Sequence, residues 1–378
     1  MRRAYGKPFG CPTRAISGYS ARGRVAGMVV TLALAGCAAG TGGGVLHYHV
    51  EEGKEAQRVM WPAPPEVPRY MYAGELTGES NFKSLDDERR KGLQGLFNWV
   101  VGLFESQPVE VVLQRPQSGA IDEQRGRIYV TDVSRQGVYV FDQKQGRLLL
   151  WEYARGFRRF VAPIGVALGA EGEVLVSDAE LGMVVRLDQE GNFVGTIGER
   201  LLKRPTGLAR DPAQGLVFVA DTYAHDIKVF DDAGRLLKVI GHRGEGPGEF
   251  NFPTHLAFAN GELYVTDTFN NRIQVFSREG DLSRRFGQRG LYVGNLVRPK
   301  GVAVDDEGNV YVVESYYDHL LVFNAAGQFL LGIGGTGQVA GKFFLPAGVW
   351  IDQHNRVFVA DMFNGRVVIF QFLGGTGG

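Results

Sequence analysis

The chain has 378 residues, 44% of them hydrophobic, which is enough to build a large buried core. Its formal net charge is zero, but residues 1–36 contain six basic residues and no acid, so the remainder is mildly acidic. Nucleic-acid binding needs a basic footprint, and we therefore expect no nucleic-acid partner.

Residues 1–36 have the pattern of an export signal. A basic stretch leads into the apolar run 25–35, which is too short to span a bilayer as a helix. The motif Leu34-Ala35-Gly36-Cys37 resembles the bacterial lipobox, in which the peptide is cut before a cysteine that becomes acylated. The alternative is a chance cysteine in an Ala/Gly-rich signal. We predict lipidation of Cys37 and a bacterial cell-envelope protein, lipid-anchored and extracytoplasmic, in the outer membrane where the host has one.

Three segments follow the signal before the main body begins. Residues 37–68 start with small residues and end in a proline-rich stretch, which predicts a tether that is flexible and then stiff. Residues 69–80 contain a strand pattern. Residues 81–104 carry apolar side chains at helical spacing, which predicts one short amphipathic helix.

From about residue 105 onward, one unit of roughly 46 residues recurs six times. In each copy an apolar strand ends in a small residue and an acid, and an apolar residue stands nine positions after that acid. The acids are Asp132, Asp178, Asp221, Asp267, Glu314 and Asp361. A proline opens each copy, at Pro116, Pro163, Pro205, Pro253, Pro299 and Pro346.

Between these anchors, short alternating runs are separated by Gly/Asp/Asn clusters, which indicates four antiparallel strands in each unit. Six such units predict an all-β fold, a six-bladed β-propeller over residues 105–374. Residues 298–314 (RPKGVAVDDEGNVYVVE) and 267–276 (DTFNNRIQVF) resemble the NHL repeat. The resemblance covers about 270 residues and implies NHL-type four-stranded blades far more than it implies an activity.

The sixth unit ends after its third strand, at residues 366–372, and lacks a fourth. Residues 70–78 match the pattern of fourth strands elsewhere, such as 236–241. We predict that 70–78 supplies the outer strand of the sixth blade. The helix that follows should lie on one face, near the mouth of the central channel, where it packs on the propeller, docks a partner or touches a membrane surface.

The six acids could ring a metal, but an acid at a strand end more simply accepts hydrogen bonds from turn amides. Where an arginine follows five residues later, as in Asp267/Arg272 and Asp361/Arg366, a local ion pair is also available. We therefore expect these acids to hold loops.

Propeller enzymes give two further comparisons. The similar peptidylglycine lyases bind zinc with three histidines near the starts of inner strands, and here that position holds a histidine only at His255. Zinc needs three or four ligands. Lactonase-like propellers hold calcium with inward carboxylates, and the inner strands here are apolar. We expect no metal, no cofactor and no catalytic constellation.

The remaining candidates are surface residues. Loops after the acids and between the blades share one face, and their Tyr, Phe and Arg side chains are typical of recognition surfaces. The opposing interpretation is that Phe269 and Phe363 only staple their loops. The candidate ligand-binding residues are Tyr223, His225, His255, Phe269, Asn270, Tyr316, Tyr317, His319, Phe363 and Asn364, with His242, Arg243, Arg289 and Arg298 nearby.

These observations favour a lipid-anchored binding or assembly scaffold for a protein or carbohydrate partner. The alternative is a metal-dependent lyase or lactone hydrolase on the same ring, with His255 near its centre. Cytoplasmic NHL proteins that bind RNA are a third class, disfavoured by the signal and the acidic body.

Overall fold

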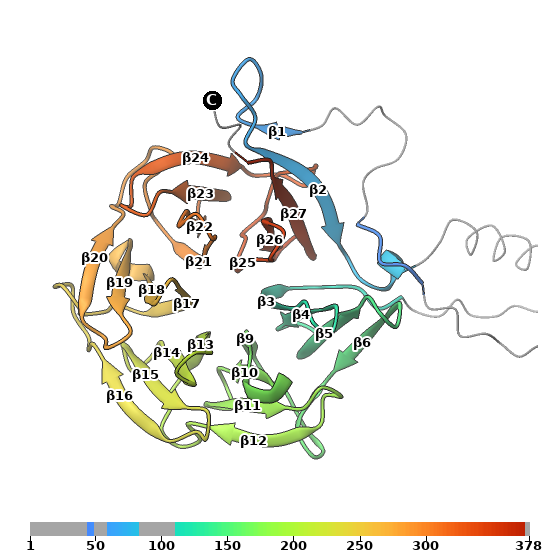
Figure 1. Cartoon of the computed structure of the whole chain (residues 1–378), viewed down its shortest axis with the longest axis vertical. Coiled ribbons are helices and arrows are strands. Elements are labelled where there is room, and N and C mark those ends of the chain that lie inside the picture. The colour runs from blue at the N-terminus through green and yellow to red at the C-terminus, as the bar shows by residue number, and fades with distance from the viewer. Residues whose placement is uncertain (1–43, 49–58, 83–109, 375–378) are drawn as a thin grey trace, which may run out of the picture. The chain divides into compact units, whose positions relative to one another are not determined.

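The computed structural model describes residues 44–48, 59–82 and 110–374. Within them, six antiparallel sheets are arranged as the blades of a propeller around a central axis (Figure 1). The predicted signal over 1–36, the predicted lipidation site Cys37 and nearly all of the predicted helical insertion 81–104 lie outside the described residues. Among the residues described, no helix is long and apolar enough to cross a membrane.

Each blade has four main strands, numbered here from the axis outward. The innermost are β3 (Pro116–Asp122), β9 (Pro163–Leu168), β13 (Pro205–Asp211), β17 (Pro253–Ala259), β21 (Pro299–Val304) and β25 (Val349–Ile351). The second are β4 (Arg127–Asp132), β10 (Val174–Asp178), β14 (Leu216–Asp221), β18 (Glu262–Asp267), β22 (Val310–Glu314) and β26 (Arg356–Asp361). The third are β5 (Gly137–Asp142), β11 (Met183–Leu187), β15 (Asp226–Asp231), β19 (Arg272–Ser277), β23 (His319–Phe323) and β27 (Arg366–Phe372).

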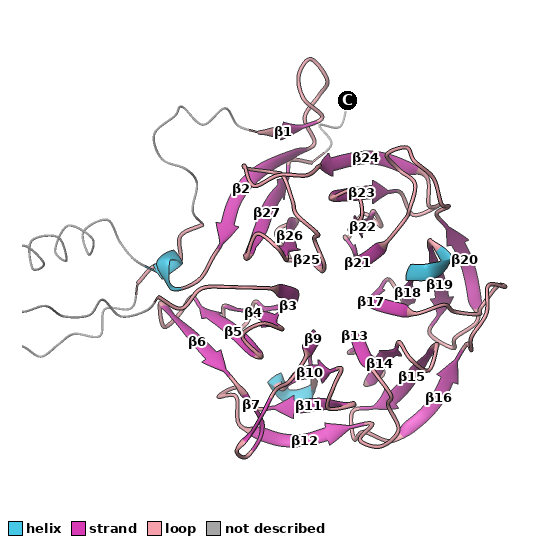
Figure 2. Cartoon of the chain, turned by 180° about the vertical axis from the view of Figure 1, so that it is seen from behind, coloured by secondary structure: helices cyan, strands magenta, loops and turns pink. Residues whose placement is uncertain are grey.

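The outer strands are β6 (Arg147–Trp151), β12 (Phe193–Ile197), β16 (Leu236–Ile240), β20 (Leu282–Phe286), β24 (Phe329–Gly334) and β2 (Tyr70–Leu76). Smaller elements are a fifth strand in the last blade, a two-stranded hairpin and three short 3-10 helices (Figure 2), namely β1 (Met60–Trp61), β7 (Tyr153–Arg155), β8 (Arg158–Arg159), η1 (Glu79–Phe82), η2 (Ala170–Gly172) and η3 (Thr268–Asn270).

The repeat pattern fixes the register of each blade. In the first five blades the opening proline pairs directly with the acid, as in Pro205 with Asp221, and the register then shifts in a bulge. Proline is tolerated here because the first residue of an edge strand needs no N–H for the hydrogen-bond ladder. The apolar residue nine positions after each acid is at most 2% exposed, at Phe141, Leu187, Phe230, Phe276, Phe323 and Phe370.

The sixth blade is completed from the other end of the chain. β2 pairs antiparallel with β27, with Glu75 opposite Val368 and Leu76 opposite Val367 (Figure 1). The Leu76 side chain is fully buried, and the Glu75 carboxylate lies 2.8 Å from the Arg366 guanidinium. Closing a propeller in this way leaves no unpaired third strand at the end of the ring.

Residues 59–68, which the sequence assigns to the tether, are part of the folded body, and this is a correction. β1 pairs with β2, and the Trp61 ring packs edge-on against the Phe370 ring, with the ring centroids 5.3 Å apart. Farther upstream, the Gly44 amide donates to the carbonyl of Gly146 in the first blade. Proline content predicted an extended spacer, but Trp61 brings enough apolar surface to dock this stretch on the ring.

Hydroxyl groups join neighbouring blades near the axis. Thr131 Oγ1 donates to the Ile164 carbonyl of the next blade at 2.6 Å, and Thr266 Oγ1 donates to the Lys300 carbonyl at 2.7 Å. Where the residue before the acid carries a hydroxyl, as at Thr131, Ser177 and Thr266, it therefore links one blade to the next.

Candidate functional site

The antiparallel order of each blade puts two kinds of loop on one face. The turns between second and third strands lie there, together with the connections from one blade to the next. We call this side the loop face. The acid at the end of each second strand lies directly beneath it.

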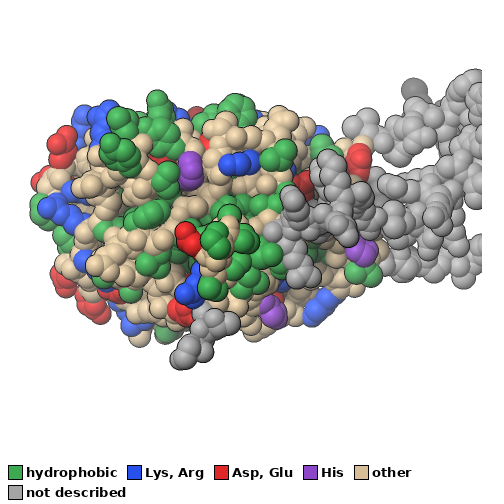
Figure 3. Space-filling model, turned by 90° about the horizontal axis from the view of Figure 1, so that it is seen from above, with side chains coloured by type: hydrophobic (Ala, Val, Ile, Leu, Met, Phe, Trp, Pro, Cys, Tyr) green, Lys and Arg blue, Asp and Glu red, His purple; other side chains and the backbone are tan. Residues whose placement is uncertain are grey.

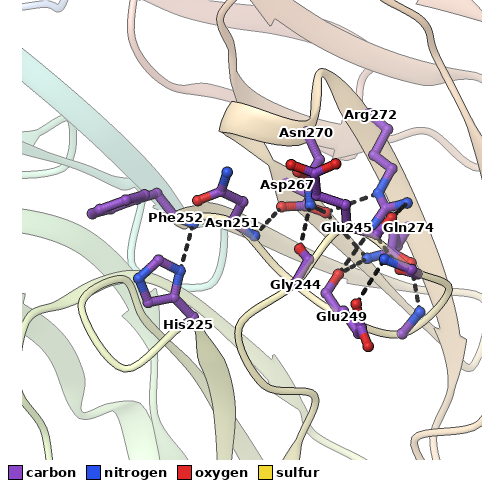
Figure 4. Close-up of polar contacts among 12 residues, drawn as sticks. His225, Gly244, Glu245, Glu249, Asn251, Phe252, Asp267, Asn270, Arg272 and Gln274 are labelled. Carbon is purple, nitrogen blue, oxygen red and sulfur yellow. Dashed lines mark hydrogen bonds and ion pairs between the residues drawn. The ribbon is translucent and has the colours of Figure 1, made fainter.

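The acids hold these loops, as expected from the sequence. In the fourth blade the Asp267 carboxylate accepts hydrogen bonds from the Asn251 amide (2.7 Å), Asn270 Nδ2 (2.8 Å) and Arg272 Nε (2.8 Å) (Figure 4). Burial raises the pKa of Asp267 above its usual value, while these three donors act in the opposite direction.

Other blades repeat the arrangement with different partners. The Asp132 carboxylate accepts from the amides of Gln114 and Arg115 on one side, and from those of Ser134 and Arg135 on the other. Each acid thus ties a blade connection to the following turn.

Three of the ten candidate residues are engaged in the same loop-holding contacts. The Asn270 amide donates to the carbonyl of Gly244 and to Asp267, and Asn364 makes the matching pair of contacts in the sixth blade. His225 is 8% exposed, and its Nδ1 accepts from the Phe252 amide (Figure 4). These side chains shape the loops from within.

Four aromatic candidates remain exposed at equivalent positions, two residues after the acid. Tyr223, Phe269, Tyr316 and Phe363 are 54%, 59%, 54% and 46% exposed. We call these four the aromatic crown. They come from blades three to six and stand on the loop face; the first two blades have Ser134 and Glu180 instead.

Arginines and one phenylalanine support the crown. The guanidinium carbon of Arg115 lies 4.8 Å from the Phe363 ring centroid, Arg204 lies 4.9 Å from Tyr223, and Arg298 lies 5.9 Å from Tyr316. Phe269 packs on Phe252, with ring centroids 4.9 Å apart. Cation–π contacts at this range are favourable, and the crown rings stay about half exposed beside them.

Tyr317 and His319 join the crown at the fifth blade. With Tyr316 they line a hollow of about 220 Å³, whose other wall is the exposed segment 291–295. The rings of Tyr316 and Tyr317 lie perpendicular at 5.0 Å, and His319 Nδ1 contacts the Tyr317 carbonyl at 2.5 Å. Burial lowers the pKa of His319, so the imidazole is neutral at pH 7.

His255 stands apart from the crown, on inner strand β17 at the channel. It is 9% exposed, and burial, reinforced by the nearby Lys300 ammonium, lowers its pKa to about 3. The equivalent places in the other blades are Ser118, Gly165, Gly207, Gly301 and Gly348. One imidazole beside a lysine does not fit a zinc ion, which needs three or four ligands and repels a neighbouring ammonium.

The opposite face brings Glu123 together with Asp352 and His354, which are far from it in the sequence. Glu123 lies in a turn of the first blade and Asp352 and His354 in one of the sixth, with ligand atoms within 4.8 Å of one another. Asp352 already accepts from Arg356 Nε at 2.5 Å and from two backbone amides, so its charge is balanced without an ion.

Sequence reasoning missed several residues of the loop face. Arg115, Arg204 and Phe252 each stand directly before the opening proline of a repeat, as Arg298 does, so aligning the six copies at that proline finds them. Lys300 directly follows such a proline, inside the segment that resembles the NHL repeat.

A second hollow, of about 660 Å³, lies at the outer edge of the ring between the segment 62–70 and the fifth blade. Figure 3 views this edge from the side of β1 and β24, and hydrophobic side chains gather on it. Val67 and Leu330 are 63% and 53% exposed.

Comparisons with known proteins agree with the fold. A family model described as a 6-bladed beta-propeller (DUF5128) matches residues 211–280 and 295–376. Peptidyl-glycine alpha-amidating monooxygenase of Mus musculus is 26% identical over 228 residues, which cover 56% of this chain and 20% of that protein. The chain thus spans about a fifth of the length of the curated relatives it matches.

Two solved structures have the same architecture. An auxiliary nutrient binding protein from Bacteroides thetaiotaomicron matches with a TM-score of 0.56 at 12% identity, over 69% of this chain and 70% of that one. A gluconolactonase from Xanthomonas campestris matches with a TM-score of 0.52 at 18% identity, over 70% and 89%. At such identities the likeness shows the fold alone. The chain is a six-bladed β-propeller.

Proposed function

We propose that the protein is a lipid-anchored, extracytoplasmic NHL-type propeller that binds a protein or carbohydrate partner on its loop face. The aromatic crown is the observation that carries this proposal. Four large rings at least 46% exposed, at matching places on one face, exceed what a fold needs to cover its own core. The nutrient binding protein from Bacteroides thetaiotaomicron supports a binding role for such a ring.

Crown residues should contribute to binding and little to stability. We expect Tyr316→Ala combined with Phe363→Ala to weaken binding of the partner at least tenfold, about 1.4 kcal/mol, because stacking contacts on two rings are lost. The Tm should change little, since both rings are half exposed. Binding is measured with a glycan array and with cross-linked envelope extract, which separate a carbohydrate from a protein partner.

The matched control is Leu237→Ala, which removes a 54% exposed side chain from outer strand β16. It should leave binding and Tm unchanged. Equal binding by the crown variant and the control would refute the crown as the site.

The lipid anchor is tested separately. We expect Cys37→Ser to abolish labelling by an alkyne fatty acid and to move the protein from the membrane fraction to the soluble fraction, because the acylated thiol is gone. Cys11→Ser is the control and should leave labelling intact. Labelling that survives the loss of Cys37 would contradict the anchor.

The alternative is a metal-dependent lyase or lactone hydrolase. The 26% identity to part of the mouse monooxygenase favours it. The single His255 and the adjacent Lys300 argue against it. Stoichiometric zinc or calcium in the purified protein, with an activity lost on chelation, would favour the enzyme.

A further inference from the structure

Polar side chains gather at the channel mouth in blades three to five. Thr206 and Thr222 of the third blade contact each other through their hydroxyls at 2.7 Å, and so do Thr254 and Thr268 of the fourth. In the fifth blade, Lys300 takes the place of Thr206 and Thr254, directly after the opening proline. The same place holds Gln117 in the first blade, Ile164 in the second and Ala347 in the sixth.

Lys300 brings a cation to this mouth without an anion to match it. Among the described residues no carboxylate forms an ion pair with Lys300, and the charge acting on it is that of Arg298, also positive. Burial and Arg298 together lower the pKa of Lys300. A half-buried ammonium beside a second cation is costly unless an anion joins it.

His255 reaches toward the strand that carries Lys300. An ideal Cβ on the equivalent Gly207 would lie 2.6 Å from the Cα of His255, so side chains at this place point at the inner strand of the next blade. For His255 that strand is β21. Lys300, on that strand, is close enough to lower the pKa of the imidazole.

The hydroxyl donors assign the proton on His255. Thr268 Oγ1 donates its hydrogen to the Pro299 carbonyl. Thr254 Oγ1 must therefore be the donor in the 2.7 Å hydrogen bond between Thr254 and Thr268. Thr254 then has no hydrogen left for its 3.0 Å contact with His255 Nδ1, and Nδ1–H is the donor. Nε2 of the neutral ring therefore holds a bare lone pair, and this buried atom has no partner.

The Lys300 ammonium, whose charge acts on His255, and the unpartnered His255 Nε2 therefore lie on neighbouring inner strands, on the side of the four crown residues. A carboxylate matches the Lys300 ammonium, and a hydroxyl can donate to His255 Nε2. Aromatic faces stack on the apolar faces of sugar rings. We propose that the channel mouth binds an acidic sugar, a uronic acid, with its carboxylate on Lys300 and a hydroxyl on His255. The proposal rests on the proposed binding function and narrows its partner to an acidic carbohydrate.

Calorimetric titration of the propeller with D-glucuronate tests this. D-glucose keeps the hydroxyls without the carboxylate, and acetate keeps the carboxylate without the hydroxyls. We expect both to bind at least tenfold more weakly than glucuronate. Lys300→Met should reduce the affinity for glucuronate to that of the unchanged protein for glucose. His255→Leu should reduce it to that of the unchanged protein for acetate.

Lys203→Met, which changes an exposed lysine on the same face, should leave glucuronate binding intact. The Tm of each variant identifies any that fail to fold, and Lys300→Gln then replaces Lys300→Met. The inference is overturned if glucuronate does not bind at 10 mM, or if it binds equally well after Lys300→Met. Crown-dependent binding of another partner would in that case leave the proposed function standing.

Discussion

Removing residues 1–80 should lower the Tm of the propeller by at least about 10 °C. The deletion removes β2, exposes the edge of β27 and breaks the Glu75–Arg366 ion pair. Loss of the fully buried Leu76 alone is worth about 2–5 kcal/mol, and each kcal/mol shifts the Tm of a large domain by about 2–4 °C. Differential scanning calorimetry measures the effect.

Deleting only residues 1–43 is the control, since it keeps β1, β2 and the docked residues 44–48. Its Tm should stay within about 3 °C of the full chain. Leu76→Ala should fall between the two deletions. If both deletions melt at the same temperature, β2 does not close the ring in solution.

The second large effect is expected at Arg272, which is 8% exposed. Its guanidinium donates to the carbonyls of Glu245 (2.8 Å), Gly246 (2.8 Å) and Glu249 (2.9 Å), and it pairs with the fully buried Asp267 (Figure 4). We expect Arg272→Met to cost about 3–5 kcal/mol, because a buried carboxylate loses its cation and three carbonyls lose their donor. Urea unfolding followed by circular dichroism measures this.

Arg235→Met is the matched control. Arg235 forms a similar 2.6 Å pair with Asp231, but its side chain is 80% exposed, so water replaces the lost contact and stability should not change. Equal losses of unfolding free energy in the two variants would show that water can replace the contacts of Arg272, and would contradict this prediction.

The architecture could be predicted from the sequence because its signals are local and repeated six times. The nine-residue interval from Asp267 to Phe276 marks one turn and one buried strand, and the same interval recurs in every blade. Because the last repeat lacks a fourth strand, its pattern indicates that another segment must supply one, and β2 does so. Trp61 gave no such signal, because a two-residue strand has no period and its docking depends on Phe370, about 300 residues away.

The site was less predictable because its contacts cross between blades. The exposed rings of Tyr316 and Phe363 could be located from the loops, but the loop-holding roles of His225 and Asn270 could not, since both depend on partners some 26 residues distant. Likewise, the role proposed for Lys300 depends on the neighbouring positions of β17 and β21, which bring Lys300 close to His255.

The closing strand also sets the order in which the molecule can assemble. Glu75 and Arg366 are 291 residues apart, so β2 is synthesised first and waits for the last strand of the ring. The first five blades pair their own neighbouring strands and can form early, whereas the sixth requires closure of nearly the whole chain as one loop. Until then β27 has a bare hydrogen-bonding edge, and the open ring is vulnerable to pairing with other chains. Conditions that shorten this open interval, such as keeping the chain extended until synthesis is complete, should therefore raise the yield of folded propeller.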